Sequence, residues 1–401
     1  MGDPMVQTCV TKSFILRDSL GGIKSVASWR TAALLAAGLT LGGVTTAYAN
    51  GSSVNGVLVA TVGLGSLQGV ASTAASGATG LPQLKTPTLI SQQSEVEITL
   101  VSFAVTKAAY DQIIPRFVND WKKKTGQSVL IRTSFAGSGT QTRAVLDGLP
   151  ADVVHLAVAS DTNRLVKGKL IEPGWEKQTP NNGIVARSVV AIETRDGNPK
   201  KINGWKDLAR PDVRWITANP KTSGVARWNY LALWGSVSES GGTEAQAKDF
   251  VTQAFKNVPI LGKDARETSD IFYKKKQGDA VLNYESEILA ATAQGQTNAS
   301  YVLPQTNISI DTPVAVVDAV VDKRKTRNVA EAFVKFLFTP IAQRDFARVG
   351  FRPVEPKVAK DFEKKYPRVS KLYTVNDLGG WDAVDKKHFA NGGVFDQIFK
   401  R

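Results

Sequence analysis

The stretch SGVARW at residues 223–228 lies between a run typical of a β-strand and a run typical of a helix. Apolar residues follow it at helical spacing from Trp228 to Trp234. A helix begins with backbone N–H groups that have no partner inside the helix, and its dipole adds partial positive charge there. The start of this helix is therefore suited to bind an anion, although a Ser-Gly pair before a helix is more commonly an ordinary cap.

A second turn of the same kind occurs earlier in the chain. It reads GSGTQ at residues 137–141 and precedes a short helical run at 143–146. Two such turns in one chain favour a shared anion site without proving it, because each turn taken alone can be explained by capping.

Strands and helices alternate on both sides of these turns, which predicts βαβ units and mainly parallel sheets. The predicted strands are 95–101, 129–133, 151–157, 189–192, 215–217, 280–284 and 313–317, and the predicted helices include 108–124, 141–146 and 328–338. Two such α/β lobes, with the chain crossing between them, would place a ligand in the cleft at strand ends and helix starts.

The first 94 residues are predicted to lie outside the fold. Arg30 precedes an apolar stretch at 32–44, and AYA at 47–49 resembles a cleavage site, which would make Asn50 the new N-terminus. A tract rich in Gly, Ser, Ala and Thr then runs to residue 94 and is predicted to be a flexible linker. The tract is long and free of acidic residues, which also fits a plastid transit sequence. Two destinations outside the cytosol therefore stay open, the bacterial periplasm and the chloroplast of an alga, at the envelope.

Composition narrows the class of ligand. The net charge is +14, but Lys and Arg are spread along the chain without a nucleic-acid motif, which favours a small anion over nucleic acid. Cys9 is the only cysteine and His155 and His388 are the only histidines, which argues against a metal site on Cys or His. We expect no cofactor, and we expect His155, in an apolar run, to lie in the core or between the lobes.

The ordered part of the chain resembles the sulfate-binding proteins of sulfate/thiosulfate ABC importers, a type of periplasmic solute receptor. No single short motif is specific, but the joint order and spacing of the matching stretches are, and they cover the chain from about residue 97 to the C-terminus: VSFA 101–104, AGSGTQ 136–141, ADVV 151–154, IEPGW 171–175, NPKTSG 219–224, ARWNY 226–230, DAR 264–266, NYESE 283–287, FRP 351–353 and HFANGG 388–393.

The resemblance implies an α/β, two-lobed periplasmic-binding-protein fold of type II, which closes on sulfate as a monomer. It also implies delivery of the anion to a membrane permease with its ATPase on the far side. The implied boundaries are lobe 1 at 95–190 with 310–345, lobe 2 at 191–309, and a C-terminal helical segment at 346–401 that packs on both lobes.

The resemblance also implies which groups donate hydrogen bonds to sulfate. They are the backbone N–H groups of Ala104, Gly224, Val225 and Ala265, a contact from Ser138, the hydroxyl and N–H of Ser223, and the phenol of Tyr284. Gly139, Arg227 and Arg266 are expected to support these groups from behind. Two positions depart from the family: Val225 replaces a glycine, which keeps its donor only if φ is negative, and Tyr284 replaces a tryptophan.

Two alternative functions follow from the same residues. The first is a receptor for another oxyanion, namely thiosulfate, molybdate, tungstate or phosphate. Phosphate keeps a proton near neutral pH and needs a buried acceptor, and the only nearby carboxylate, Asp264, is expected to pair with Arg266 or to point to solvent. The second alternative is a hydrolase that uses Ser138 or Ser223. A nucleophilic serine needs an adjacent base, and the chain has two histidines and no G-x-S-x-G elbow, so we expect no enzyme.

Overall fold

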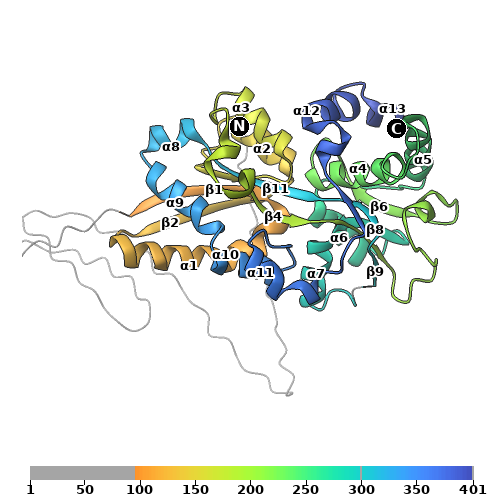
Figure 1. Cartoon of the computed structure of the whole chain (residues 1–401), viewed down its shortest axis with the longest axis horizontal. Helices are drawn as coiled ribbons and strands as arrows, with labels where there is room; N and C mark the ends of the chain where they lie inside the picture. The colour runs from red at the N-terminus through yellow and green to blue at the C-terminus, as the bar shows by residue number, and fades with distance from the viewer. Residues whose placement is uncertain (1–94, 299, 400–401) are drawn as a thin grey trace, which may run out of the picture. The chain divides into compact units, whose positions relative to one another are not determined.

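The computed structural model describes residues 95–298 and 300–399 (Figure 1). The predicted targeting sequence and linker at 1–94 lie outside the described residues. The described chain forms two five-stranded sheets with helices packed on them and one two-stranded ribbon. We call the parts built on the two large sheets lobe 1 and lobe 2.

The sheet of lobe 1 has the strand order β2-β1-β3-β11-β4. β1 is parallel to β2 and β3, whereas β11 is antiparallel to β3 and β4. Its strands are β1 (Val96–Phe103), β2 (Val129–Ala136), β3 (Val153–His155), β4 (Ile184–Ser188) and β11 (Ile310–Val316). Its helical segments are η1 (Ala104–Thr106), α1 (Lys107–Thr125), α2 (Ser138–Leu146), α3 (Ala159–Lys167), η2 (Trp175–Gln178), η3 (Pro180–Gly183), α8 (Asp318–Arg324) and α9 (Arg327–Leu337).

The sheet of lobe 2 has the order β7-β6-β8-β5-β9. β6 is parallel to β7 and β8, whereas β5 is antiparallel to β8 and β9. Its strands are β5 (Val190–Thr194), β6 (Trp215–Ala218), β7 (Leu261–Gly262), β8 (Ala280–Tyr284) and β9 (Tyr301–Val302). Its helical segments are η4 (Trp205–Ala209), α4 (Gly224–Ser238), α5 (Glu244–Lys256), α6 (Ala265–Tyr273) and α7 (Glu285–Ala293).

The chain passes between the sheets at two neighbouring places. Val189 alone separates β4 from β5, and one residue separates β10 (Thr306–Ile308) from β11. The Asn307 side chain ties the two crossings together, because its Nδ2 donates to the Val190 carbonyl at 2.7 Å and its Oδ1 accepts from the Val190 N–H at 3.3 Å. Two adjacent crossings of this kind form a hinge on which lobes can close.

The C-terminal part of the chain contacts both lobes. α10 packs against α1 in lobe 1, α13 packs against α5 in lobe 2, and β12 pairs in parallel with β10. The elements are α10 (Pro340–Arg348), α11 (Pro356–Asp361), η5 (Glu363–Lys365), β12 (Lys371–Tyr373), η6 (Val375–Leu378), α12 (Gly380–Val384), η7 (Asp385–Phe389) and α13 (Val394–Ile398).

The prediction of a two-lobed α/β fold is confirmed, but the sheets are mixed rather than mainly parallel. In each lobe a strand next to a crossing runs against its neighbours: β11 brings the chain back into lobe 1 and β5 brings it into lobe 2. The residues of β3, β5, β6 and β8 are all buried, as expected for strands covered on both faces. Among the described helices, none combines the length and apolar character needed to cross a membrane.

Candidate anion site at the meeting of helix starts

A small cavity lies between the two lobes, where several helices begin. Its volume is about 10 Å³, roughly the space that one water-sized sphere occupies. Six of the seven predicted ligand residues line it, and Val225 is the exception. The lining consists of Phe103, Ala104, Gly137, Ser138, Ala157, Ser223, Gly224, Asp264, Ala265 and Tyr284. This lining contains no Lys, Arg or His, so the groups that can attract an anion there are backbone N–H groups and hydroxyls.

Four helical segments begin at this cavity. Ala104 is the first residue of η1, Ser138 of α2, Gly224 of α4 and Ala265 of α6. Within 95–298 and 300–399, the N–H groups of these four residues have no backbone acceptor outside their helices. No acidic side chain lies in the first turn of η1, α2 or α4. These N–H groups are therefore available to an anion, which the helix dipoles also favour.

Ser223 is the residue directly before α4, with an extended backbone (φ −128°, ψ 130°). Its N–H donates to the Asn219 carbonyl at 2.9 Å, so the prediction that this N–H is free for the ligand is wrong. Its hydroxyl makes no capping bond to α4 and is 96% buried with the rest of the residue. The hydroxyl is thus the group that Ser223 can offer.

Ser138 is also restricted to one kind of contact. Its Oγ donates to Asp161 Oδ2 at 2.7 Å and accepts from the Ala157 N–H at 3.0 Å. The hydroxyl proton is committed to a buried carboxylate, so the contact predicted for Ser138 can come only from its backbone N–H.

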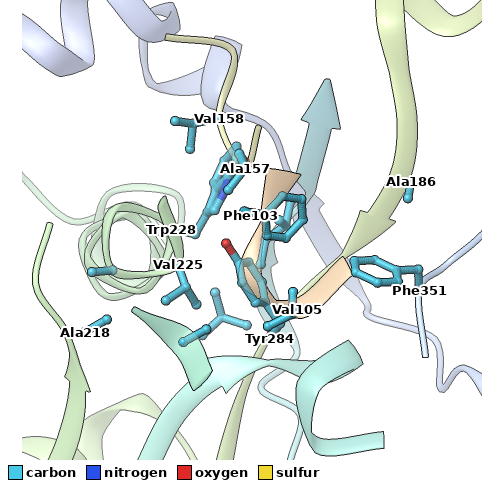
Figure 2. Close-up of a cluster of buried hydrophobic side chains, with 14 of the residues drawn as sticks. Phe103, Val105, Ala157, Val158, Ala186, Ala218, Val225, Trp228, Tyr284 and Phe351 are labelled. Atoms are coloured by element: carbon cyan, nitrogen blue, oxygen red, sulfur yellow. Dashed lines mark hydrogen bonds between the residues drawn. The ribbon is translucent and has the colours of Figure 1, made fainter. Parts of the chain in front are cut away.

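Tyr284 ends β8 and immediately precedes α7. Its ring lies against Phe103, with 5.9 Å between centroids, and Figure 2 shows its hydroxyl on the side where Val225 and Trp228 lie. Burial, with lesser effects from Asp161 and Glu287, raises the pKa of Tyr284 well above its usual value. The hydroxyl therefore stays protonated, and as a donor it can meet an anion in the cavity.

Val225 keeps a negative φ, because it is the second residue of α4 and is absent from the left-handed positions of the described chain. Its N–H belongs to the unpaired first turn of the helix. The condition stated for replacing glycine at this position is therefore met.

Asp264 does not behave as expected. It is 94% buried and lines the cavity, and its Oδ1 accepts from the Glu267 N–H at 2.9 Å as the cap of α6. Arg266 pairs instead with Glu287 at 3.2 Å. The expectation that Asp264 pairs with Arg266 or faces solvent is wrong, because the unpaired N–H groups at the start of α6 attract its carboxylate.

The lobes are in close contact around the cavity. A Cβ built on Gly137 would lie 2.5 Å from the Thr222 carbonyl oxygen, and one built on Gly224 would lie 2.5 Å from the Ala157 Cβ. Gly139, expected to support the site, would place a Cβ 3.4 Å from the same Thr222 oxygen. The two lobes therefore meet at Gly137 and Gly224 too closely for a larger residue, whereas Gly139 has room for a Cβ.

Arg227 bridges the lobes behind the cavity. Its Nη1 lies 3.2 Å from Asp161 Oδ1 and donates to Ser160 Oγ at 3.0 Å, and both partners belong to α3. Its Nε donates to the Pro220 carbonyl, three residues before the SGVARW stretch. Arg227 thus connects the loop before α4 to α3 of lobe 1, and it does not line the cavity.

Comparisons with known proteins identify the family of the chain. A family model described as "Bacterial extracellular solute-binding protein" matches residues 98–352. The chain belongs to this family. The "Sulfate-binding protein" of Synechococcus elongatus is 56% identical over 304 residues, which are 76% of this chain and 86% of that protein.

Two further relatives of this solute-binding protein are instructive. The "Thiosulfate-binding protein" of Pseudomonas aeruginosa is 37% identical over 75% of this chain and 91% of that protein. Among solved structures, the sulfate-binding protein SubI from Mycobacterium tuberculosis is 37% identical. It superposes with a TM-score of 0.67 and covers 73% of this chain and 98% of that one.

Sequence reasoning on the solute-binding protein missed two residues that bind the Ser138 hydroxyl, Asp161 and Ala157. Asp161 is fully buried and receives both the Ser138 hydroxyl and Arg227, and Ala157 offers its N–H to Ser138 and its carbonyl to the Trp228 indole at 2.8 Å. Neither stands in a motif. The one available signal was an acidic residue, between Ser160 and Thr162, in the first turn of the helix after β3.

His155 lies in the core of lobe 1, one of the two places expected. Its Nδ1 is 2.7 Å from the Tyr110 hydroxyl and its Nε2 is 3.1 Å from Thr312 Oγ1. Thr312 donates its own proton to the Ala186 carbonyl, so Nε2 carries the ring proton. His388 bonds Tyr230. No described serine at the cavity has a histidine base beside it, and no described group of His, Cys, Asp and Glu is arranged to hold a metal ion.

We expect the His155 ring to stay neutral in mild acid. Burial lowers its pKa from 6.5 to about 3, so the unfolded chain binds this proton below pH 6.5 and the folded chain does not. The contribution of His155 to the free energy of unfolding is therefore fully present above pH 6.5 and decreases as the pH falls toward 3. At about pH 5 the decrease amounts to about 2 kcal/mol.

The measurement is a nitrogen NMR titration of the two histidine rings. His388, whose pKa burial lowers to about 4, should also remain neutral near pH 6. Ring signals report the protonation of each histidine directly, whereas the free energy of unfolding sums over all groups. Burial raises the pKa of Glu285 and Glu287, and these carboxyls make the folded chain more stable as the pH falls, opposite to His155. A His155 signal that titrates near pH 6.5 would contradict its buried, neutral state.

Proposed function

We propose that this protein binds sulfate in the cavity and delivers it to an ABC importer. One observation carries the proposal: four helical segments from two lobes begin at one small cavity and present unpaired N–H groups to it. Such a site holds a small, fully deprotonated anion without a buried counter-charge, which would cost desolvation energy. The names of the sulfate- and thiosulfate-binding relatives support the same ligand class.

The proposed donors are the N–H groups of Ala104, Ser138, Gly224, Val225 and Ala265, with the hydroxyls of Ser223 and Tyr284. The ligand would join N–H groups of η1 and α2 in lobe 1 to those of α4 and α6 in lobe 2, so binding would favour closure at the hinge. We keep the lobe boundaries expected from the sequence, 95–190 with 310–345 and 191–309, with 346–401 packed on both.

The transport context is part of the proposal. A solute-binding protein that closes on sulfate would present it to a permease whose ATPase lies across the membrane. Export from the cytosol follows from the family, and the periplasm and the algal chloroplast envelope remain the two destinations proposed. The protein would act as a binding protein and not as an enzyme, as a monomer, and without a cofactor.

Calorimetric titration of the purified protein with sulfate, thiosulfate, molybdate and phosphate tests the ligand assignment. Tightest binding of sulfate or thiosulfate supports it. Tighter binding of molybdate would mean that the protein is a receptor for that oxyanion. In a separate assay, hydrolysis of activated esters would support the alternative that the protein is a serine hydrolase.

We expect Ser223→Ala to weaken sulfate binding by about ten- to a hundredfold. The Ser223 hydroxyl is not used for capping, and a hydrogen bond to a charged group contributes about 1.5–3 kcal/mol. Titration of the variant measures the change, and Ser236→Ala, whose hydroxyl bonds the Leu233 carbonyl in the middle of α4, is the matched control. An unchanged dissociation constant would leave Ser223 as a residue that only begins the helix.

We expect Tyr284→Phe to lower sulfate affinity about tenfold while the thermal midpoint changes little. The substitution removes only the hydroxyl and keeps the ring against Phe103. Titration and a thermal melt give the two quantities. Full affinity in the variant would make Tyr284 a wall of the cavity, with its predicted donor role refuted.

A further inference from the structure

The helices that begin at the cavity in lobe 2 are tied to one strand by buried amides. Asn283, in β8 and 1% exposed, donates from Nδ2 to the Ala265 carbonyl at 3.2 Å and to Ser269 Oγ at 3.0 Å. Its Oδ1 accepts from the Tyr284 N–H at 2.9 Å. One side chain therefore contacts the first turn of α6 and the residue whose phenol lies at the cavity.

A second amide does the same for α4. Asn229, fully buried, donates from Nδ2 to the Leu282 carbonyl of β8 at 2.9 Å and to Thr217 Oγ1 of β6 at 2.8 Å. The helices α4 and α6 are thus hydrogen-bonded to two consecutive residues of β8, Leu282 and Asn283.

The Asn283 amide is locked by a further set of bonds. The Ser269 hydroxyl donates a hydrogen bond to Glu287 Oε1 at 3.1 Å. Arg266 Nη1 forms an ion pair with the same oxygen at 3.2 Å. Because Ser269 donates to Glu287, it must accept from Asn283, and this fixes which end of the amide faces α6.

We propose that Asn283 is a positioning residue of the anion site, whose amide sets the start of α6 and Tyr284 relative to one another. The inference rests on the proposed function, since it concerns the donors of that site. Asn283 does not line the cavity, so it acts through Ala265 and Tyr284 and not by touching the ligand.

Only an amide satisfies all three partners. A leucine of similar size would remove the amide's bonds to the Ala265 carbonyl, to Ser269 Oγ and to the Tyr284 N–H, and the Ala265 carbonyl would keep only its bond within α6. An ionised aspartate would place an acceptor against the Ala265 carbonyl, whereas a protonated aspartate has one donor, enough for the Ala265 carbonyl or Ser269 Oγ but not both, and one acceptor for the Tyr284 N–H. The charge state of Asn283→Asp therefore reports on the geometry.

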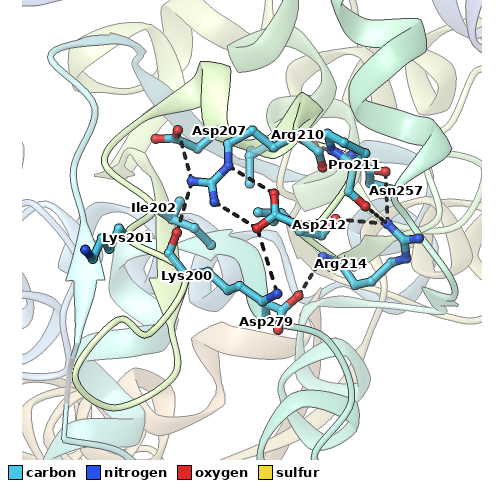
Figure 3. A network of polar contacts seen from close by, with 12 residues as sticks. Lys200, Lys201, Ile202, Asp207, Arg210, Pro211, Asp212, Arg214, Asn257 and Asp279 are labelled. Atoms are coloured by element: carbon cyan, nitrogen blue, oxygen red, sulfur yellow. Dashed lines mark hydrogen bonds and ion pairs between the residues drawn. The ribbon is translucent and has the colours of Figure 1, made fainter.

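Lobe 2 offers a matched control in Asn257, which is 7% exposed (Figure 3). Its Nδ2 donates to the carbonyls of Leu208 and Arg210 at 2.9 and 2.7 Å, and its Oδ1 accepts from Arg214. Like Asn283, it is a buried amide that donates twice from Nδ2 and accepts once at Oδ1, but none of its partners lines the cavity.

The test measures sulfate affinity of the purified protein and of Asn283→Leu, Asn283→Asp and Asn257→Leu by calorimetry, with a thermal melt for each. We expect Asn283→Leu to bind sulfate about tenfold or more weakly, because two donors lose their positions. Asn257→Leu should lose comparable thermal stability and keep its affinity.

The pH profile separates positioning from charge repulsion. We expect Asn283→Asp to bind weakly near about pH 8 and to recover in part toward about pH 5, while the wild type and Asn283→Leu change little. The titratable or charged groups around this position are Glu287 on α7, Glu193 on β5, and Asp264, Arg266, Asp270 and Tyr273 on α6. The wild-type profile accounts for them, because all are present in each protein.

Each outcome decides a separate point. A wild type that binds no oxyanion would overturn the proposed function and, with it, this role. A wild type that binds sulfate beside an Asn283→Leu variant of equal affinity would overturn the inference alone, and any pH-dependent loss in Asn283→Asp would then be repulsion by its charge. Equal losses of affinity in Asn283→Leu and Asn257→Leu would also overturn it, since general destabilisation would explain both.

Discussion

Gly137→Ala is expected to weaken sulfate binding by at least about a hundredfold and to abolish the compaction that sulfate causes. The added Cβ would lie 2.5 Å from the Thr222 carbonyl oxygen and 3.3 Å from the Lys263 carbonyl oxygen. Both oxygens belong to the backbone of lobe 2, so they cannot move aside as a flexible side chain would. The lobes would have to stay apart, and donors on the two lobes could not reach one anion.

Calorimetry and X-ray scattering with and without sulfate measure the two effects. Gly204→Ala serves as the control, since a Cβ there meets nothing within 4 Å and its backbone is extended, with φ 176°. The control should bind and compact like the wild type. A Gly137→Ala protein that still contracts on sulfate with full affinity would refute the closed contact as a requirement for binding.

Selectivity should give the second large effect, a preference for sulfate over phosphate of about 10⁴-fold at neutral pH. The Ser138 hydroxyl proton is committed to Asp161, and Asp264 Oδ1 is committed to the Glu267 N–H, so the groups proposed to bind the ligand are donors and the second oxygen of Asp264 is the one side-chain acceptor left in the described lining. A P–OH group would then oppose a donor or leave one unpaired, which is the basis of strong discrimination. Competition titrations at constant sulfate give the ratio.

The variant Asp264→Asn tests whether the Asp264 carboxylate affects the choice between sulfate and phosphate. It removes the charge while an asparagine oxygen can still cap α6. If Asp264 takes no part in ligand choice, the variant should keep the wild-type ratio. Comparable affinities for phosphate and sulfate in the wild type, removed by Asp264→Asn, would mean that the second carboxylate oxygen accepts the phosphate proton. The sulfate assignment would then fall.

The elements of the fold were largely accessible from hydrophobic patterns. Residues 280–284 were predicted as a strand and are β8, and the predicted helix at 108–124 is α1 with one residue more at each end. Short strands such as β7 and β9 carry too few residues for a pattern. The direction of β11 was not accessible either, because the orientation of a returning strand depends on partners distant in the sequence.

Some features of the candidate site were also predictable from the sequence and others were not. Glycine and serine before helical runs indicated the starts of α2 and α4, because unpaired N–H groups impose local chemistry on those positions. The use of each hydroxyl was not predictable, since the proton of Ser138 is taken by Asp161 from another helix and the N–H of Ser223 by a turn. Asp264 was misjudged because pairing with the neighbouring Arg266 competed with capping of α6, and capping prevails in the structure.

The place of β11 in the lobe 1 sheet has a consequence for how the chain acquires its structure during synthesis. β11 lies between β3 and β4, yet all of lobe 2 is encoded before it. While the chain emerges from the ribosome, lobe 2 gains all its strands first, and lobe 1 has an unfilled slot in the middle of its sheet until residue 316 is free. Such a late, long-range pairing slows folding. Lobe 1 therefore stays incomplete for most of translation, which is the state that a translocation channel for unfolded chains requires.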